Sequence, residues 1–181
     1  MISVGLDLSL THTGYVVINE KGKTLKHGVI KSKPCGDRPM DEIKRIIKIR
    51  KDIFDIIEDF LSNEKEKTII CIEGLAFMAQ GTSLTQLAGL SYMTRANLDM
   101  YSRPFIIVAP TTLKKFITGS GKGDKDQIMM AVYKNYGFEA SDNNEADAFS
   151  LAVCGLAVLG KPINKLNKPQ GEVVSLLRKQ L

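Results

Sequence analysis

Three carboxylates stand in stretches of the chain that are otherwise apolar, where an ionised side chain is costly. Asp7 interrupts the first apolar run, Glu73 follows a β-branched run over 68–72, and Asp147 lies among alanine, phenylalanine and leucine. An unpaired buried charge is too expensive to keep, so each of these acids needs a cation or several hydrogen-bond donors. If folding brings them together, their mutual repulsion calls for cations between them.

Each acid also has a simpler explanation. Aspartate near the end of a strand often caps the following turn with its side chain, and the stretch around Asp7 fits this alternative equally well. Acids favour the N-terminus of a helix, where backbone N–H groups are free. That preference explains Asp142 and Glu145 well, but it explains Asp147 less well because this residue lies one turn further in.

Magnesium is the cation that best suits a small group of carboxylates. It takes a few carboxylate oxygens, keeps several waters and leaves positions for phosphate oxygens. Two such ions a few ångströms apart contact both the attacking and the leaving oxygen of a phosphodiester. From spacing alone, a two-ion phosphodiester site is a hypothesis.

The elements that must position these acids follow from the apolar pattern. Alternation and turn residues predict an antiparallel three-strand meander near the N-terminus, followed by two strands buried on both faces. Helical periodicity predicts helices that cover the sheet, the last of them unusually apolar. The predicted strands cover 2–8, 14–18, 24–31, 68–72 and 104–108. The principal helices cover 40–62, 83–100, 125–136 and 143–159, with Ser83 as an N-cap, and a single helical turn is expected over 173–178. The order predicts an α/β fold with a mixed five-stranded sheet and helices on both faces.

Length and composition limit the class of protein. The chain has 181 residues, 44% of them apolar, which fits one domain with a sizeable core. Its formal net charge of +5 is compatible with a polyanionic partner, and most of the excess lies in 161–181. No run is long enough to span a bilayer and no secretion signal is present, so we expect a cytoplasmic protein. The three widely spaced cysteines fit a reducing compartment and offer no zinc pattern.

Four segments together resemble one family. They are 5–14, 72–78, 113–127 and 145–148, and in order and spacing they resemble the RuvC-type Holliday-junction resolvases, more the phage-type branch than the cellular one. The resemblance covers about residues 1–158. It implies an RNase H-like fold, a homodimer, and magnesium-dependent symmetric nicking of four-way DNA junctions.

The resemblance also assigns metal ligands. Asp7, Glu73 and Asp147 match three of the four metal-binding acids of the family, which makes them the expected catalytic residues. The fourth position falls on Asn144, whose amide oxygen can bind a metal but brings no charge. The neighbouring acids Glu145 and Asp142 are held as alternatives to Asn144. Two Mg²⁺ ions per site are implied, with Mn²⁺ as a substitute.

Contacts to DNA are implied by the same comparison. Phe77 matches an aromatic residue at the junction centre, where a ring can stack on an unpaired base, and its alternative is a loop residue packed into the core. Lys125 matches a lysine that contacts DNA, while the family's other lysine falls on Ser120, so Lys122 is expected to supply that charge.

The sequence therefore predicts a magnesium-dependent endodeoxyribonuclease that resolves four-way junctions, within a nuclease domain over 1–160 followed by a basic C-terminal arm over 161–181. Two alternatives remain open. One is an RNase H-like nuclease acting on other branched DNA or on RNA/DNA hybrids. The other is a junction-binding protein that has lost cleavage, because Asn144 replaces an acid.

Overall fold

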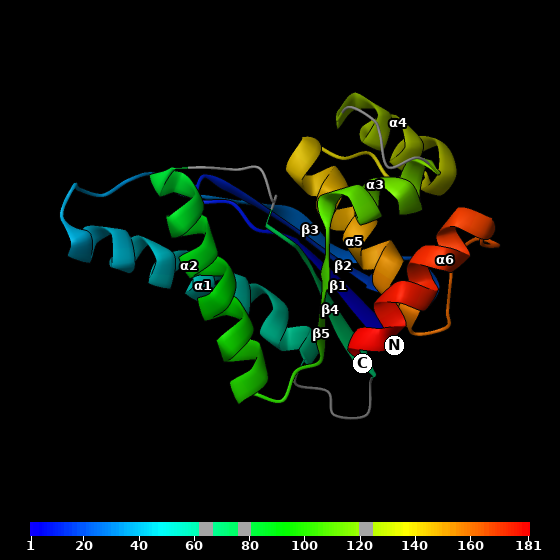
Figure 1. The fold of residues 1–181 in the computed structure, drawn as a ribbon, viewed down its shortest axis with the longest axis horizontal. Helices are drawn as coiled ribbons and strands as arrows, with labels where there is room; N and C mark the ends of the chain where they lie inside the picture. The colour runs from blue at the N-terminus through cyan, green and yellow to red at the C-terminus, as the bar shows by residue number, and fades with distance from the viewer. Residues whose placement is uncertain (62–66, 76–80, 120–124) are drawn as a thin grey trace.

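A mixed five-stranded sheet forms the centre of the molecule (Figure 1). The computed structural model describes residues 1–61, 67–75, 81–119 and 125–181. Within these ranges the strand order is β3-β2-β1-β4-β5. β2 pairs antiparallel with both β1 and β3, and β4 pairs parallel with both β1 and β5. The strands are β1 (Ile2–Asp7), β2 (His12–Asn19), β3 (Thr24–Lys31), β4 (Thr68–Glu73) and β5 (Phe105–Val108). The predicted meander joined to parallel strands is confirmed.

Helices cover both faces of this sheet, as Figure 1 shows. One face carries α1 (Pro39–Leu61) and α2 (Thr82–Met100). The other face carries α5 (Asn143–Val158), with α3 (Pro110–Thr118), α4 (Lys125–Tyr136) and α6 (Lys168–Leu177) packed around it. No helix in the described ranges is long and apolar enough to cross a membrane.

The two faces have separate cores because side chains alternate along each strand. In β1, Val4 and Leu6 are fully buried against α1 and α2. α1 meets them with a stripe of isoleucines at helical spacing: Ile46, Ile49, Ile53 and Ile57. Burying each such side chain contributes about 1.5–3 kcal/mol. The alternate residues of β1 therefore face α5.

The C-terminal residues 161–181 pack onto the rest of the protein. Val173, Val174 and Leu177 of α6 are buried in the core on the α5 face. After α6, the side chain of Gln180 accepts a hydrogen bond from Ile107 N and donates one to Ile107 O, both at 2.9 Å, on the edge strand β5. The separation of this segment as an arm beginning at residue 161 stays a prediction.

Two helix starts differ from the sequence-based prediction. α2 begins at Thr82 with Gly81 as its N-cap and no side-chain cap, so Ser83 as the N-cap was wrong. Gly81 has φ 97°, a conformation that favours glycine over serine. α6 begins at Lys168, before the single turn expected from 173 to 178, because Asn167 and Gln170 form a capping box.

Candidate active site

Strand register brings Asp7 and Glu73 to one level of the sheet. The parallel pairing of β1 with β4 places Leu6 opposite Ile72, and the next residue along each strand is an acid. Because Leu6 and Ile72 belong to the core beneath α1 and α2, alternation turns both acids toward the α5 face. Neighbouring strands lie about 4.8 Å apart, so the two backbones are close at this point.

Glycines on the sheet let α5 approach it closely. A Cβ at Gly5 would overlap the carbonyl oxygen of Ala148 and lie 2.7 Å from the backbone nitrogen of Ala152. A Cβ at Gly14 would lie 3.1 Å from the nitrogen of Glu145 and would overlap the carbonyl group of Asn144. The backbone of α5 therefore rests on two strands at positions without a side chain, and its first turns lie over the end of β1.

One cavity of about 270 Å³ collects the predicted ligands. Asp7, Glu73, Asn144 and Asp147 all line it. Asp7 itself is only 8% exposed, which makes its carboxylate costly to leave without compensation. Among the residues described, no three side chains of His, Cys, Asp or Glu are gathered tightly enough to form a ready-made metal cluster. The predicted ligands share a cavity, and their role as metal ligands stays a prediction.

A lysine that was not predicted from the sequence as a site residue also lines this cavity. Lys114 lies on α3, the helix that follows β5 directly, and lines the cavity together with Pro110 and Leu113. Its signal in the sequence is its place just beyond the carboxyl end of a buried strand, the edge where α/β sheets hold ligands. A cation here contributes positive charge beside three carboxylates and is well placed to meet a phosphate.

Asp142 and Glu145, the alternatives to Asn144 as the fourth ligand, make contacts outside this cavity. Asp142 is the N-cap of α5, where its Oδ1 accepts a hydrogen bond from Glu145 N at 2.9 Å. Glu145 is 2% exposed; its Oε2 accepts from Ser141 N, and its Oε1 lies 2.6 Å from His27 Nδ1 on β3. Neither carboxylate is among the groups that line the cavity with Asp7. Asn144 is the candidate of this group that the structure brings to the site.

Hydrogen bonding controls the ionisation of Glu145. Burial raises the pKa of its carboxyl, but the hydrogen bonds from Ser141 and His27 outweigh this and lower the net pKa below its ordinary value of 4.5. An ionised Glu145 therefore fastens the start of α5 to β3.

The predicted DNA contacts lie largely outside the described residues. Phe77 and Lys122 both fall in ranges that the structure does not describe. Lys125 is the first residue of α4, on the same side of the sheet as α3 and α5. Their roles stay predictions.

The fold and the acids at its parallel-strand edge define a protein of the RNase H-like class. The family model described as "Crossover junction endodeoxyribonuclease RuvC" matches residues 3–155, and the chain belongs to this family. The resemblance to the RuvC-type family is thereby confirmed, and its placement in the phage-type branch stays a prediction. Crossover junction endodeoxyribonuclease, the enzyme class predicted for the chain, is the name that this family carries.

Individual relatives agree with this assignment. The protein from Rhizobium rhizogenes (strain K84 / ATCC BAA-868) with the same description is 29% identical over 154 residues, covering 83% of this chain and 86% of its own. The one from Bartonella henselae is also 29% identical over 154 residues, with the same coverage. The Thermus thermophilus RuvC structure superimposes with a TM-score of 0.70 at 19% identity, covering 89% of this chain and 98% of its own. A second structure, T. thermophilus RuvC in complex with Holliday junction substrate, gives a TM-score of 0.68 at 20% identity, covering 89% of this chain and 97% of its own. At this identity the structural matches show the fold.

Proposed function

We propose that the protein is a divalent-metal-dependent endonuclease that nicks four-way DNA junctions, with Asp7, Glu73 and Asp147 as its catalytic carboxylates. The observation that carries this proposal is the shared cavity, because acids from β1, β4 and α5 line one space at the carboxyl edge of the parallel strands. Membership of the crossover junction endodeoxyribonuclease family supports the same substrate.

The residues of the cavity suit magnesium. Carboxylate and amide oxygens are hard ligands, the donor set that Mg²⁺ and Mn²⁺ prefer over softer metals. Asp7, Glu73 and Asp147 would hold up to two ions, with Asn144 as a neutral ligand. When bound, such ions supply Lewis-acid activation of water and neutralise charge on the scissile phosphate.

The protein's own side chains perform the remaining work. Lys114 binds a non-bridging phosphate oxygen at the edge of the cavity and offsets the negative charge of the DNA strand. The close seat of α5 on Gly5 and Gly14 holds Asp147 in place relative to Asp7. Glu145 and His27 fix the start of the same helix from β3. Rigid support of this kind keeps reacting groups within the small tolerance that catalysis requires.

A homodimer fits both the substrate and the surface. A four-way junction has approximate two-fold symmetry, and a two-fold dimer would present two cavities in matching relation. Large apolar side chains are exposed along α2 and just after it, with Tyr92 at 62%, Met100 at 74% and Tyr101 at 59%. A dimer contact over this helix would remove these side chains from water, which favours association. Sedimentation equilibrium tests this part of the proposal, and a monomer at micromolar concentration would contradict it.

The deciding experiment uses an end-labelled four-way junction incubated with and without Mg²⁺. We expect paired nicks at symmetric positions that require the metal. Asp7→Asn should abolish nicking and keep junction binding, because it removes one charge from the cavity and little volume. Full activity of this variant would refute the role of Asp7 in catalysis.

Two alternatives are settled by the same assay. Flaps and RNA/DNA hybrids run in parallel identify a nuclease with a different preferred substrate. The presence of Asn144 in the cavity, where the family pattern calls for an acid, favours a junction-binding protein without cleavage as the second candidate. Tight junction binding without nicking in either Mg²⁺ or Mn²⁺ would establish it.

A further inference from the structure

A second cavity of about 560 Å³ adjoins the one that holds the acids. Ser9, directly after the Asp7–Leu8 pair, lines both cavities. The second cavity lies between the turn that joins β1 to β2 and the first turns of α2. Its volume lies in the range of about 300–1,000 Å³ that suits small ligand groups. A strand whose phosphate sits among the acids would therefore reach it with an adjacent nucleotide.

The chemistry of the walls favours a nucleobase over a phosphate. Leu8, Leu10, Pro34 and Leu87 supply apolar surface, and Ser83 and Gln86 supply hydrogen-bonding groups. A base has apolar faces and a polar edge, and proteins bind extruded bases through this combination. A phosphate would instead require cations. Among the described residues that line this second cavity, Arg45 is the one with a charged side chain.

Arg45 is engaged in holding the turn. Its Nη2 donates to the carbonyl oxygen of Leu10, and its Nε donates to Ser32 Oγ at 3.2 Å. Its position is thus fixed by the protein itself. The guanidinium shapes the cavity, and its contacts keep Leu10 in the wall.

The wall next to the acids is also held in one conformation. Thr13 Oγ1 donates to Ser9 O at 2.7 Å and accepts from Ser9 N at 3.1 Å. Ser9 Oγ accepts from the backbone nitrogens of Thr11 and His12 at 3.2 and 3.3 Å. Four hydrogen bonds within five residues make a preformed turn, so little ordering remains to be done when a ligand enters.

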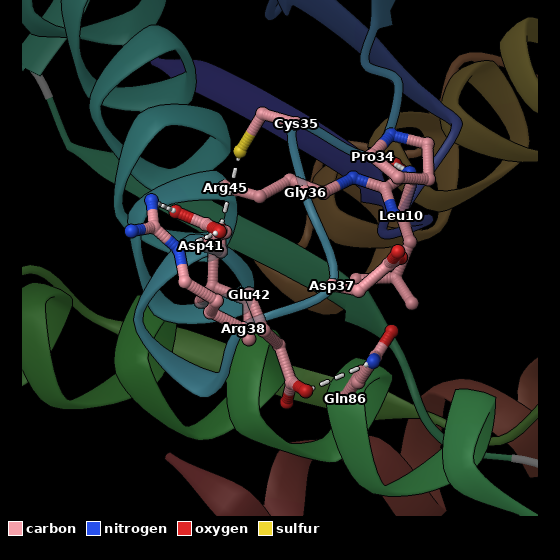
Figure 2. Close-up of a pocket in the computed structure, with 11 residues that line it drawn as sticks. Leu10, Pro34, Cys35, Gly36, Asp37, Arg38, Asp41, Glu42, Arg45 and Gln86 are labelled. Carbon is pink, nitrogen blue, oxygen red and sulfur yellow. Dashed lines mark hydrogen bonds and ion pairs between the residues drawn. The ribbon is translucent and has the colours of Figure 1, made fainter.

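An acidic pocket adjoins this cavity, and Figure 2 shows the residues that line it. It measures about 280 Å³ and shares Leu10, Pro34, Arg45 and Gln86 with the cavity described above. Asp37, Asp41 and Glu42 line it, and Arg38 is engaged with Asp41 through two hydrogen bonds of 2.8 and 2.9 Å. With Asp41 paired to Arg38, the lining carries three carboxylates and two guanidinium groups, so this pocket offers a phosphodiester chain no net positive charge.

The orientation of Gln86 is fixed by the acidic pocket. Its Nε2 donates to Glu42 Oε2 at 3.0 Å, and Figure 2 shows its oxygen directed away from Glu42. Gln86 lines both cavities and keeps its amide oxygen on the side away from Glu42, and an acceptor of this kind suits the amino edge of adenine or cytosine.

We propose that this second cavity is a base-binding subsite that takes one nucleobase flanking the scissile phosphate, with Gln86 and Ser83 at its polar edge. The inference rests on the proposed function and deepens it, because it names a part of the substrate and the residues that contact it. Extruding a base is least costly where pairing is already broken, as at the branch point of a junction. The subsite thereby contributes to selection of branched DNA.

Junctions that carry a single abasic residue at successive positions around the cut test this subsite. In the wild-type protein, one position flanking the nick should lower the single-turnover cleavage rate at least tenfold. In Gln86→Leu the same abasic residue should lower the rate less than threefold, because the contact is already lost. Thr85→Val is the matched control, since Thr85 lines a different cavity on α2 and should keep the full penalty. The absence of a position-specific penalty, or an undiminished penalty in Gln86→Leu, overturns the subsite.

A binding readout separates this inference from the nuclease proposal. Asp7→Asn protein is mixed with a junction carrying 2-aminopurine at the sensitive position, or at each flanking position in turn. The subsite predicts a rise in fluorescence at one position as the base leaves the stack, and a smaller rise when Gln86→Leu is added. No rise at any position refutes the subsite even if wild-type protein nicks the junction. A rise in Asp7→Asn together with no nicking by the wild-type protein refutes the nuclease and keeps the subsite. Ser83→Ala, with the smaller change in volume, repeats the test if Gln86→Leu folds poorly.

Discussion

Adding a single methyl group at Gly5 should damage catalysis more than stability. Gly5→Ala places a Cβ within 2.7 Å of the nitrogen of Ala152 and in overlap with the carbonyl oxygen of Ala148, whereas ordinary contacts begin near 3.4 Å. α5 must move away from β1 by roughly 0.7 Å or more, because a packed interior has no free space to absorb the methyl group. Overpacking of this kind costs about 1–3 kcal/mol.

The same shift carries Asp147 away from Asp7, since Asp147 directly precedes Ala148 on the helix. A misplacement of about 1 Å lowers rates on the order of 10²-fold. Urea unfolding measures the loss of stability, and single-turnover cleavage of a four-way junction measures the loss of rate. The control is Gly171→Ala in α6, where a Cβ meets no atom within 4 Å. It should stabilise the protein by about 0.5–1 kcal/mol and leave cleavage unchanged.

If Gly5→Ala matches the wild type in both stability and cleavage rate, direct packing of α5 on β1 does not set the position of Asp147. A large loss of stability with an unchanged rate in the folded fraction would refute the catalytic half alone.

The remaining predictions concern charge and stacking. Glu145→Gln should be less stable than wild type at neutral pH, as measured by urea unfolding. Because the folded-state pKa of Glu145 is depressed, this difference in stability should persist above pH 4.5, the ordinary pKa, and shrink as the pH falls below that value. A difference that grows in acid would contradict the assignment. Asn144→Asp should lower the Mg²⁺ concentration needed for half-maximal cleavage several-fold, because it adds a charged ligand; an unchanged metal titration would remove this residue from the ligand set. Phe77→Ala should reduce cleavage of junctions more than binding to duplex DNA, since stacking on an unpaired base is worth about 1–3 kcal/mol, and equal losses would argue against stacking.

The grouping of the two strand acids was predicted from the sequence only in part. A polar residue at the end of a buried parallel strand emerges at the carboxyl edge of the sheet, which applies to Glu73. Its convergence with Asp7 was a hypothesis from spacing and an implication of the family resemblance, and the structure has both residues lining one cavity. Asp147 was placed by its apolar neighbours, which could only belong to a helix packed on the sheet.

Other features could not be read from local patterns. The pairing of Glu145 with His27 joins residues far apart in the chain, so neither residue alone signals it. Lys114 was not predicted from the sequence, because its place at the cavity depends on the direction of α3 after β5. For the Glu145–His27 pair and for Lys114, a long-range contact decides the role. The start of α6 is different, because the Asn167–Gln170 capping box is a local signal that marks it.

The placement of the acids on β1, β4 and α5 also makes maturation of the protein cooperative. Parallel pairing of β1 with β4 must wait for the intervening crossover, and α5 can dock only after most of the chain has been synthesised. Contacts of such long sequence separation form late and slow folding. A nascent or partly unfolded chain therefore lacks an assembled set of carboxylates. If these carboxylates are the catalytic ones, as proposed, an incompletely folded copy cannot cut DNA through them.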